Sequence, residues 1–331
     1  MTTISTCPNP SYWRILRYWS RLLKSHPKRM PFLLTKILEV FAFSRNKSSV
    51  DIISDYQPMI SQNHVENNVS NSPQIAVVIP AFIRNENEAS QLNRLIERLH
   101  DQSKSIHDII VVDDFSPFHY QIPSGITHKK LAINGGPAIA RNVGIEISLK
   151  NDAEIILFTD VDCVPDNQWV EEMVSMFQNS MHSQIISGMT KSRNWNWLGK
   201  YHEINGTLNG RRFLNSDLLL YGPTCNLAIT RKVATNLKFS EAFPIAAGED
   251  IDYCFRAIHS GFSIHHCPSA VVHHDYGYDH QNLRMRIGSF LKQFGRYAQG
   301  ENILLQKHPE YYSYLEMTEW ISADSSVSVR N

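Results

Sequence analysis

Two pairs of aspartates directly follow apolar segments in this chain. Asp113 and Asp114 close the segment "IIVV", and Asp160 and Asp162 close "IILFT". An aspartate is also an ordinary way to end a strand, so one acidic end carries little information. Two acidic ends on one edge of a sheet concentrate negative charge, which requires a cation or hydrogen-bond donors. Carboxylate oxygens are ligands that Mg²⁺ and Mn²⁺ prefer, so the pattern favours a metal site.

A third acidic group, "GEDID", lies further along the chain at residues 248–252, where a helix is expected to begin. Asp252 would lie in the first turn of that helix, where the helix dipole stabilises negative charge. Arg256 follows four residues later, at the spacing of a helical ion pair. Asp250 points in a different direction from Asp252 on such a helix. We therefore expect Asp252 to have a structural role, which is to stabilise this helix.

Histidines are concentrated in one part of the chain, but their pattern does not indicate zinc. Adjacent pairs lack the spacing of structural zinc sites, and the five cysteines include no C-x-x-C pair that could join them. The scattered cysteines favour a reducing compartment. The histidines concerned are His265, His266, His273, His274 and His280.

The apolar segments that precede these acids predict a sheet, which would position the acidic side chains. Residues 74–80, 107–112 and 154–159 are apolar segments of strand length. Apolar residues at helical spacing fill residues 89–100, and a second helix is expected after the Gly-Gly-Pro at 135–137. Alternating strands and helices predict an α/β fold with a mixed, mainly parallel sheet flanked by helices. In such sheets ligands bind beyond the carboxyl ends of the strands.

The composition divides the chain into three segments and argues against nucleic acid as a partner. Residues 1–72 are expected to form a basic amphipathic helical extension with a polar linker, residues 73–280 the α/β domain, and residues 281–331 an amphipathic helical tail. The 331-residue chain has 32 basic and 32 acidic residues, so nucleic acid is not expected as a partner.

Residues 9–45 mix aromatic and aliphatic side chains with basic ones. Short cationic helices of this kind suit an anionic membrane surface, and the alternative is that their apolar face packs on the α/β domain. No apolar segment reaches the roughly 18 residues that span a bilayer, and the first residues lack the layout of a secretory signal. We therefore expect the protein in the cytoplasm, at the cytoplasmic membrane face if residues 9–45 bind lipid.

Seven segments together resemble the family 2 glycosyltransferases with the GT-A fold. In chain order they are "IAVVIPAF", "IIVVDDFSP", "NGGPAIARNVGIE", "LFTDVDCVPD", "YGPTCNLAITR", "AGEDIDYCFRAIHSGFSI" and "PSAVVHHDY". The resemblance covers Gln74 to Tyr276, and weaker similarity extends to Pro309. It implies transfer of a sugar from a nucleotide-diphosphate donor with inversion at the anomeric carbon. It also implies Mn²⁺ or Mg²⁺ as the cofactor that stabilises the departing diphosphate.

The resemblance assigns the metal ligands. Asp162 matches the acid that binds the metal directly, and Asp160 matches one that holds the ribose or binds the metal through water. His273 best matches a histidine that completes the metal shell. His274 is the alternative, because a shift of one residue in strand register reverses the face on which a side chain lies.

The resemblance also assigns the nucleotide-binding residues. Asp114 matches an acid that accepts a hydrogen bond from the base, which favours uracil or thymine. Arg141 matches a cation near the pyrophosphate or the sugar, and its alternative is an ion pair with one of the aspartates at the strand ends. The other residues assigned to the nucleotide sugar are Pro80, Ala81 and Phe82 under the base, Asp113, which could instead be structural, Asn134, Gly135 and Asn142.

The acceptor side needs a base, because the attacking hydroxyl must lose its proton. Asp250 matches the catalytic aspartate of the family, and Glu249 is the adjacent acid that positions the acceptor or the base. Trp195, Trp197 and Asn226 are predicted on the acceptor side, with the alternative that the tryptophans cover the core. The acceptor is expected to be a glycan or a lipid-linked molecule.

Two other functions are consistent with parts of this pattern. A sugar-phosphate nucleotidyltransferase also has an α/β sheet, but the chain lacks the Gly-rich, basic opening segment that grips a triphosphate. A catalytically inactive nucleotide-binding or sugar-binding scaffold is the other alternative, and the presence of both Asp162 and Asp250 argues against it.

Overall fold

The computed structural model describes residues 69–180, 182–279 and 281–323. The predicted extension therefore lies outside the described residues up to residue 68, and so does the segment 9–45 with its membrane contact. Within the described part of the chain, no helix combines the length and the apolar character that a bilayer-spanning segment requires.

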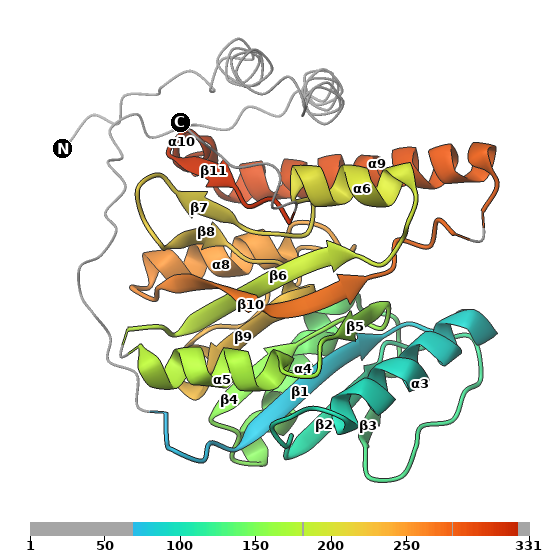
Figure 1. Cartoon of the computed structure of the whole chain (residues 1–331), viewed down its shortest axis with the longest axis horizontal. Coiled ribbons are helices and arrows are strands. Elements are labelled where there is room, and N and C mark those ends of the chain that lie inside the picture. The colour runs from blue at the N-terminus through green and yellow to red at the C-terminus, as the bar shows by residue number, and fades with distance from the viewer. Residues whose placement is uncertain (1–68, 181, 280, 324–331) are drawn as a thin grey trace.

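An eight-stranded sheet forms the centre of the fold (Figure 1). Four of its strand pairs are parallel (β1–β2, β1–β4, β2–β3 and β6–β10), and three are antiparallel (β4–β9, β6–β9 and β5–β10). The prediction of an α/β fold with a mixed, mainly parallel sheet is confirmed. In spatial order the strands are β3 (Thr127–Lys130), β2 (Asp108–Asp113), β1 (Ile75–Ala81), β4 (Ile155–Phe158), β9 (Leu227–Thr230), β6 (Ile185–Ser192), β10 (Ile264–His274) and β5 (Cys163–Pro165).

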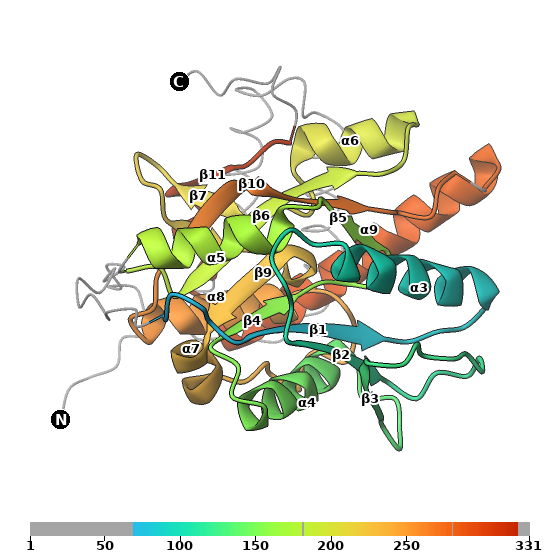
Figure 2. The ribbon, with the colours of Figure 1, turned by 60° about the horizontal axis from the view of Figure 1, so that its bottom comes forward.

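Helices cover both faces of this sheet, as Figure 2 shows for α3 (Glu86–His100) and α5 (Trp169–Asn179) on one side and α4 (Pro137–Lys150) and α7 (Arg231–Asn236) on the other. Strand β1 shows why helices must pack on both faces of the sheet. Its alternate residues Ile75, Val77 and Ile79 pack with α3 and α5. Ala76 and Val78 pack with α4 and α8 (Glu249–His259) instead. The side-chain period of two along a strand therefore divides one continuous apolar segment between two cores.

The segment after residue 280 packs back on the domain. Helix α9 (Leu283–Lys307) contacts α6 (Trp197–Asn205) through aromatic rings, and the two helices lie along one edge of Figure 1. The short α10 (Tyr311–Leu315) leads to β11 (Thr318–Trp320). The latter pairs with β7 (Arg211–Phe213), which pairs with β8 (Leu219–Tyr221), so the C-terminal segment completes a second, three-stranded sheet.

Candidate active site

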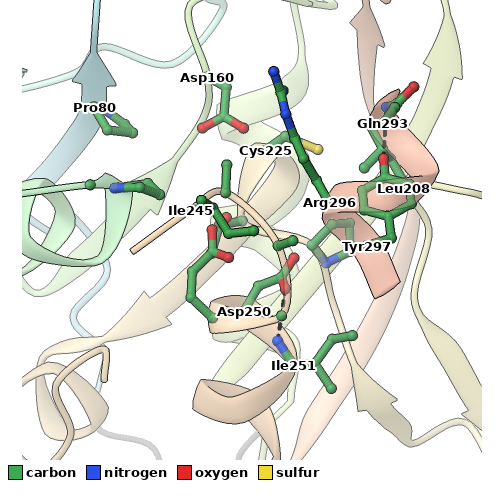
Figure 3. A pocket seen from close by; sticks show the side chains of 18 of the residues that line it. Pro80, Asp160, Leu208, Cys225, Ile245, Asp250, Ile251, Gln293, Arg296 and Tyr297 are labelled. Atoms are coloured by element: carbon green, nitrogen blue, oxygen red, sulfur yellow. Dashed lines mark hydrogen bonds between the residues drawn. The ribbon is translucent and has the colours of Figure 1, made fainter. Parts of the chain in front are cut away.

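A cavity of about 710 Å³ lies at the carboxyl ends of the central parallel strands. Its lining includes Pro80 from the end of β1, Asp114 after β2, and Asp160 and Asp162 after β4. The loop before α8, the start of α8 and the face of α9 also contribute to its lining. In Figure 3 the carboxyl groups of Asp160 and Asp250 point into this cavity from opposite sides.

Asp162 lies beside a histidine, and the register of the sheet decides which one. The short strand β5 pairs antiparallel with the end of β10, and this pairing sets Cys163 opposite His274. As a result His274 Nε2 lies 3.3 Å from Asp162 Oδ1. His273, one residue earlier, faces away and its Nε2 lies 3.1 Å from Asp166 Oδ1. The structure therefore brings the predicted alternative, His274, rather than His273, next to Asp162.

These residues fit a divalent cation. Asp162 offers carboxylate oxygens, and the Nδ1 atom of His274 is buried with no hydrogen-bond partner in the part of the chain that the structure describes. Burial raises the pKa of Asp162, and His274 opposes that effect. A bound cation would favour the charged carboxylate for the same electrostatic reason. Asp162 and His274 could thus hold Mn²⁺ or Mg²⁺ on the cavity side of the sheet.

Arg141 connects the ends of two elements that are distant in sequence. Its Nη1 lies 2.8 Å from Glu249 Oε1, and its Nη2 lies 3.0 Å from Asp160 Oδ1. Burial opposes the charge of Arg141, but the two carboxylates outweigh burial and raise its pKa. This is the ion pair that the sequence offered as the alternative role of Arg141. It fixes the start of α8 beside the acidic end of β4.

Asp250 lies in the first turn of α8. Gly248 begins the helix with φ of 86°, where a Cβ atom would lie 3.0 Å from the carbonyl oxygen of Gly300. The carboxylate of Asp250 accepts a hydrogen bond from the backbone N–H of Ile251 at 2.8 Å. Burial and the neighbouring Glu249 raise the pKa of Asp250 to about 7, against the opposing effect of Arg141. Asp250 can therefore exchange a proton near neutral pH.

Asp114 orders the glycine turn before α4. Its two carboxylate oxygens accept hydrogen bonds from the backbone N–H groups of Gly135 and Gly136 at 2.7 and 2.8 Å. Asn134 donates to the Asp114 carbonyl at 3.2 Å. Asp114, Asn134 and Gly136 line the cavity, so this turn forms one of its walls. The carboxylate still faces the cavity, where each oxygen can accept a further bond.

Asp113 and Asn142 have structural partners instead. Asp113 accepts from the backbone N–H of Ser116 at 2.7 Å and lies 3.4 Å from Lys130 Nζ. Burial opposes the charge of Asp113, but these partners lower its pKa. The side chain of Asn142 bonds both the carbonyl and the N–H of Phe239. Neither residue is among those that line the cavity.

The three predicted acceptor-side residues also do not line the cavity. Asn226 is fully buried, accepts from Trp169 Nε1 at 2.8 Å, and donates to two backbone carbonyls. Trp195 is fully exposed and Trp197 is 58% exposed, so they do not cover the core either. The physical reason is that Asn226 satisfies buried polar groups between strands, while the tryptophans lie at the exposed start of α6.

Helix α9 supplies cavity residues that the sequence analysis missed. Gln293, Arg296 and Tyr297 line the cavity, and Figure 3 shows the Arg296 side chain running across it. Gln293 accepts from Tyr278 Oη at 3.0 Å and donates to Tyr297 Oη at 2.7 Å, which fixes this face of the helix. The signal that could have found them is the spacing of three polar residues at positions i, i+3 and i+4 of one helix.

Residues 76–236 match the family described as "Glycosyl transferase family 2". The chain carries a glycosyltransferase family 2 domain. The match contains the acidic ends of β2 and β4 and the glycine turn before α4. The catalytic aspartate expected from the resemblance lies after the matched residues, on α8.

Curated relatives are distant. The pre-mycofactocin glycosyltransferase of Mycobacterium tuberculosis is 25% identical over 251 residues, which cover 71% of this chain and 48% of the relative. Glycosyltransferase AglE of Haloferax volcanii is 24% identical over 205 residues, covering 59% of this chain and 64% of the relative. This chain therefore spans about half the length of the first relative and under two thirds of the second.

A solved structure of S. aureus TarS in complex with UDP is also similar, at 17% sequence identity and a TM-score of 0.48. The similarity covers 73% of this chain and 72% of the TarS chain. A TM-score below 0.5 does not establish a common fold, and the UDP belongs to TarS.

Proposed function

We propose that this protein is an inverting glycosyltransferase of the GT-A type. It would move a sugar from a nucleotide-diphosphate donor, with UDP or dTDP favoured, to the hydroxyl group of a glycan or of a lipid-linked acceptor. One observation carries this proposal: Asp162 with its neighbour His274, which could bind a metal, and the protonatable Asp250 line the same cavity. Such a cavity can neutralise a leaving diphosphate and accept a proton from an attacking hydroxyl group.

The donor would bind along the strand ends. Asp162 and His274 would hold Mn²⁺ or Mg²⁺, which stabilises negative charge on a diphosphate. Arg296 adds a cation from α9, and no carboxylate within the described residues pairs with it by a salt bridge.

The base would lie over the backbone of Pro80, Ala81 and Phe82, and Asp114 would accept a hydrogen bond from it. Asp160 is held by Arg141, which leaves its second oxygen for the ribose or a metal-bound water.

The acceptor would be activated by Asp250. A base works best when its pKa lies near the working pH, and the pKa of about 7 meets that condition. Burial and then the neighbouring Glu249 keep the pKa of Asp250 high, and Arg141 holds Glu249 in place. The cavity wall opposite the strand ends comes from α9, so we place the acceptor between Asp250 and that helix. A membrane-bound acceptor, met at the cytoplasmic face, is proposed because residues 9–45 are basic and aromatic.

Nucleotide binding tests the donor side directly. Thermal shift and calorimetry would compare UDP, dTDP, GDP and ADP, each with and without Mn²⁺, on the wild type and on Asp162→Ala. We expect metal-dependent binding of UDP or dTDP that Asp162→Ala removes. The matched control is Asp166→Ala, because Asp166 pairs with His273 away from the cavity. If folded wild-type protein binds none of the four nucleotides, the proposal fails and the inactive scaffold gains support.

A further inference from the structure

A buried thiol adjoins Asp162. Cys163 is 1% exposed, and its Sγ lies 3.9 Å from Asp162 Oδ1. Cys163 also lies directly opposite His274 in the β5–β10 pairing. One donor atom from each of Asp162, Cys163 and His274 lies within 4.8 Å of the other two. Cys225, which lines the cavity, has its Sγ 3.8 Å from Thr190 Oγ1.

This mixture of donor atoms differs from the set that Mg²⁺ and Mn²⁺ prefer. Hard cations take oxygen ligands, whereas sulfur and imidazole nitrogen suit Zn²⁺ and chemically similar ions. Ligands held about 2.0 to 2.3 Å from one zinc ion lie within roughly 4 Å of one another in a tetrahedral site. Small rotations of the three side chains would therefore close the present cluster around such an ion.

The imidazole gives a second, independent indication of a ligand. His274 is 9% exposed, and its Nδ1 atom is buried without a hydrogen-bond partner among the described residues. A buried ring nitrogen without a partner costs free energy unless a donor, a water molecule or a cation satisfies it. His274 Nε2 lies 3.3 Å from Asp162 Oδ1, and one ring nitrogen of His274 lies within 4.8 Å of a donor atom of each of the other two residues.

We infer that Asp162, Cys163 and His274 form a binding site for a thiophilic divalent cation of the Zn²⁺ class. The inference rests on the proposed function, because Asp162 and His274 are also the proposed ligands of the donor metal. Asp162 and His274 line the cavity, so a cation held by these residues would adjoin the space proposed for the diphosphate. Binding converts the Cys163 thiol to a thiolate and releases its proton to solvent. Zn²⁺ would thus compete with Mn²⁺ for one site.

The spacing of the histidines does not indicate a zinc site, because a spacing pattern reveals only ligands that lie close together in the sequence. Here the cysteine and the carboxylate come from residues 162–163, and the histidine comes from a strand more than a hundred residues later. The antiparallel register of β5 and β10 is what joins them.

Cobalt titration tests the inference without requiring turnover. Co²⁺ is a spectroscopic substitute for Zn²⁺, and a cysteine thiolate bound to it gives a sulfur-to-cobalt charge-transfer band in the near ultraviolet. The chain would carry Cys7→Ser, which removes a thiol outside the described residues. We expect this band to saturate at one equivalent, to be lost in Cys163→Ser and Cys163→Ala, and to be displaced by Zn²⁺ but not by Mg²⁺. The matched control Cys267→Ser should retain it, because Cys267 bonds Glu172 and Ser269 elsewhere.

The outcomes separate this inference from the proposed function. Absence of the band in folded protein, or its persistence in Cys163→Ser, overturns the thiolate ligand whatever the nucleotides do. If the cobalt band forms but no nucleotide binds with any metal, the cation site stands and the glycosyltransferase proposal fails.

Discussion

At the scale of single residues, the protonation of Asp250 should set the pH dependence of the reaction. Its pKa is raised to about 7, so the carboxylate that acts as base is lost as pH falls below 7. We expect kcat/KM for donor hydrolysis to fall about tenfold per pH unit below that value. Asp250→Asn should lower kcat by roughly 10² to 10⁴ and abolish this limb, with nucleotide affinity retained. An unchanged acidic limb in Asp250→Asn would assign the proton transfer to another group.

Arg296 is the second residue whose role can be isolated. It lines the cavity, whereas Lys292, one turn earlier on the same helix, is exposed and does not. A hydrogen bond to a charged group contributes about 1.5 to 3 kcal/mol, so Arg296→Ala should weaken UDP binding roughly 10- to 100-fold. Lys292→Ala serves as the control and should leave the affinity within about twofold, as measured by calorimetry. Equal, small effects in both variants would exclude Arg296 from diphosphate binding.

At the scale of elements, α8 is held by a buried ion cluster that keeps Asp250 in place. Asp252 is fully buried, and its oxygens lie 2.8 to 2.9 Å from Arg256, Lys307 and His308. Burial opposes the charge of Asp252, but these three partners lower its pKa to about 2. The cluster therefore ties the first turn of α8 to the end of α9. It confirms the ion pair with Arg256 expected from the sequence and adds two partners that the sequence did not reveal.

Removing this carboxylate should destabilise the fold. Asp252→Asn is expected to lower the free energy of unfolding by roughly 3 kcal/mol, the low end for breaking a buried ion pair, because Arg256 and Lys307 are 27% and 30% exposed. The folded-state pKa is depressed, so this contribution is present above pH 4 and is lost as pH falls toward 2. Urea denaturation across that range measures it. The exposed pair of Lys238 and Glu146 is the control, and Glu146→Gln should cost under about 1 kcal/mol.

Local sequence patterns predict where the helices and strands begin and end, but they do not predict how distant strands pair. The strand ends, the glycine turn and the start of α8 follow from local patterns, and the structure brings Asp114, Asp160, Asp162 and Asp250 to one cavity. The choice between His273 and His274 could not be made locally, because it depends on the pairing of β10 with a three-residue strand.

At the scale of the whole molecule, the contacts that complete the site join residues far apart in the chain. Arg141 and Glu249 are separated by 108 positions, and no local pattern indicates that they pair. Asn226 was predicted on the acceptor side, but its partners in the core are visible only in three dimensions. Residues 281–331 were predicted as an amphipathic helical tail, and an amphipathic pattern alone does not indicate that the apolar face of the helix packs on this domain.

The C-terminal segment should be required for the α/β domain to fold, although the sequence predicts that this domain ends at residue 280. Leu304, Tyr311, Tyr314 and Leu315 are at most 4% exposed and belong to the same apolar core as the central strands. Losing large buried side chains costs roughly 2 to 5 kcal/mol each, and four such losses approach or exceed a net stability of about 5 to 15 kcal/mol. We expect the chain 1–280 to show no cooperative thermal transition by circular dichroism, while the control chain 1–323 unfolds like the full-length protein. Cooperative unfolding of 1–280 would instead establish an independent domain and leave α9 as an accessory to the cavity.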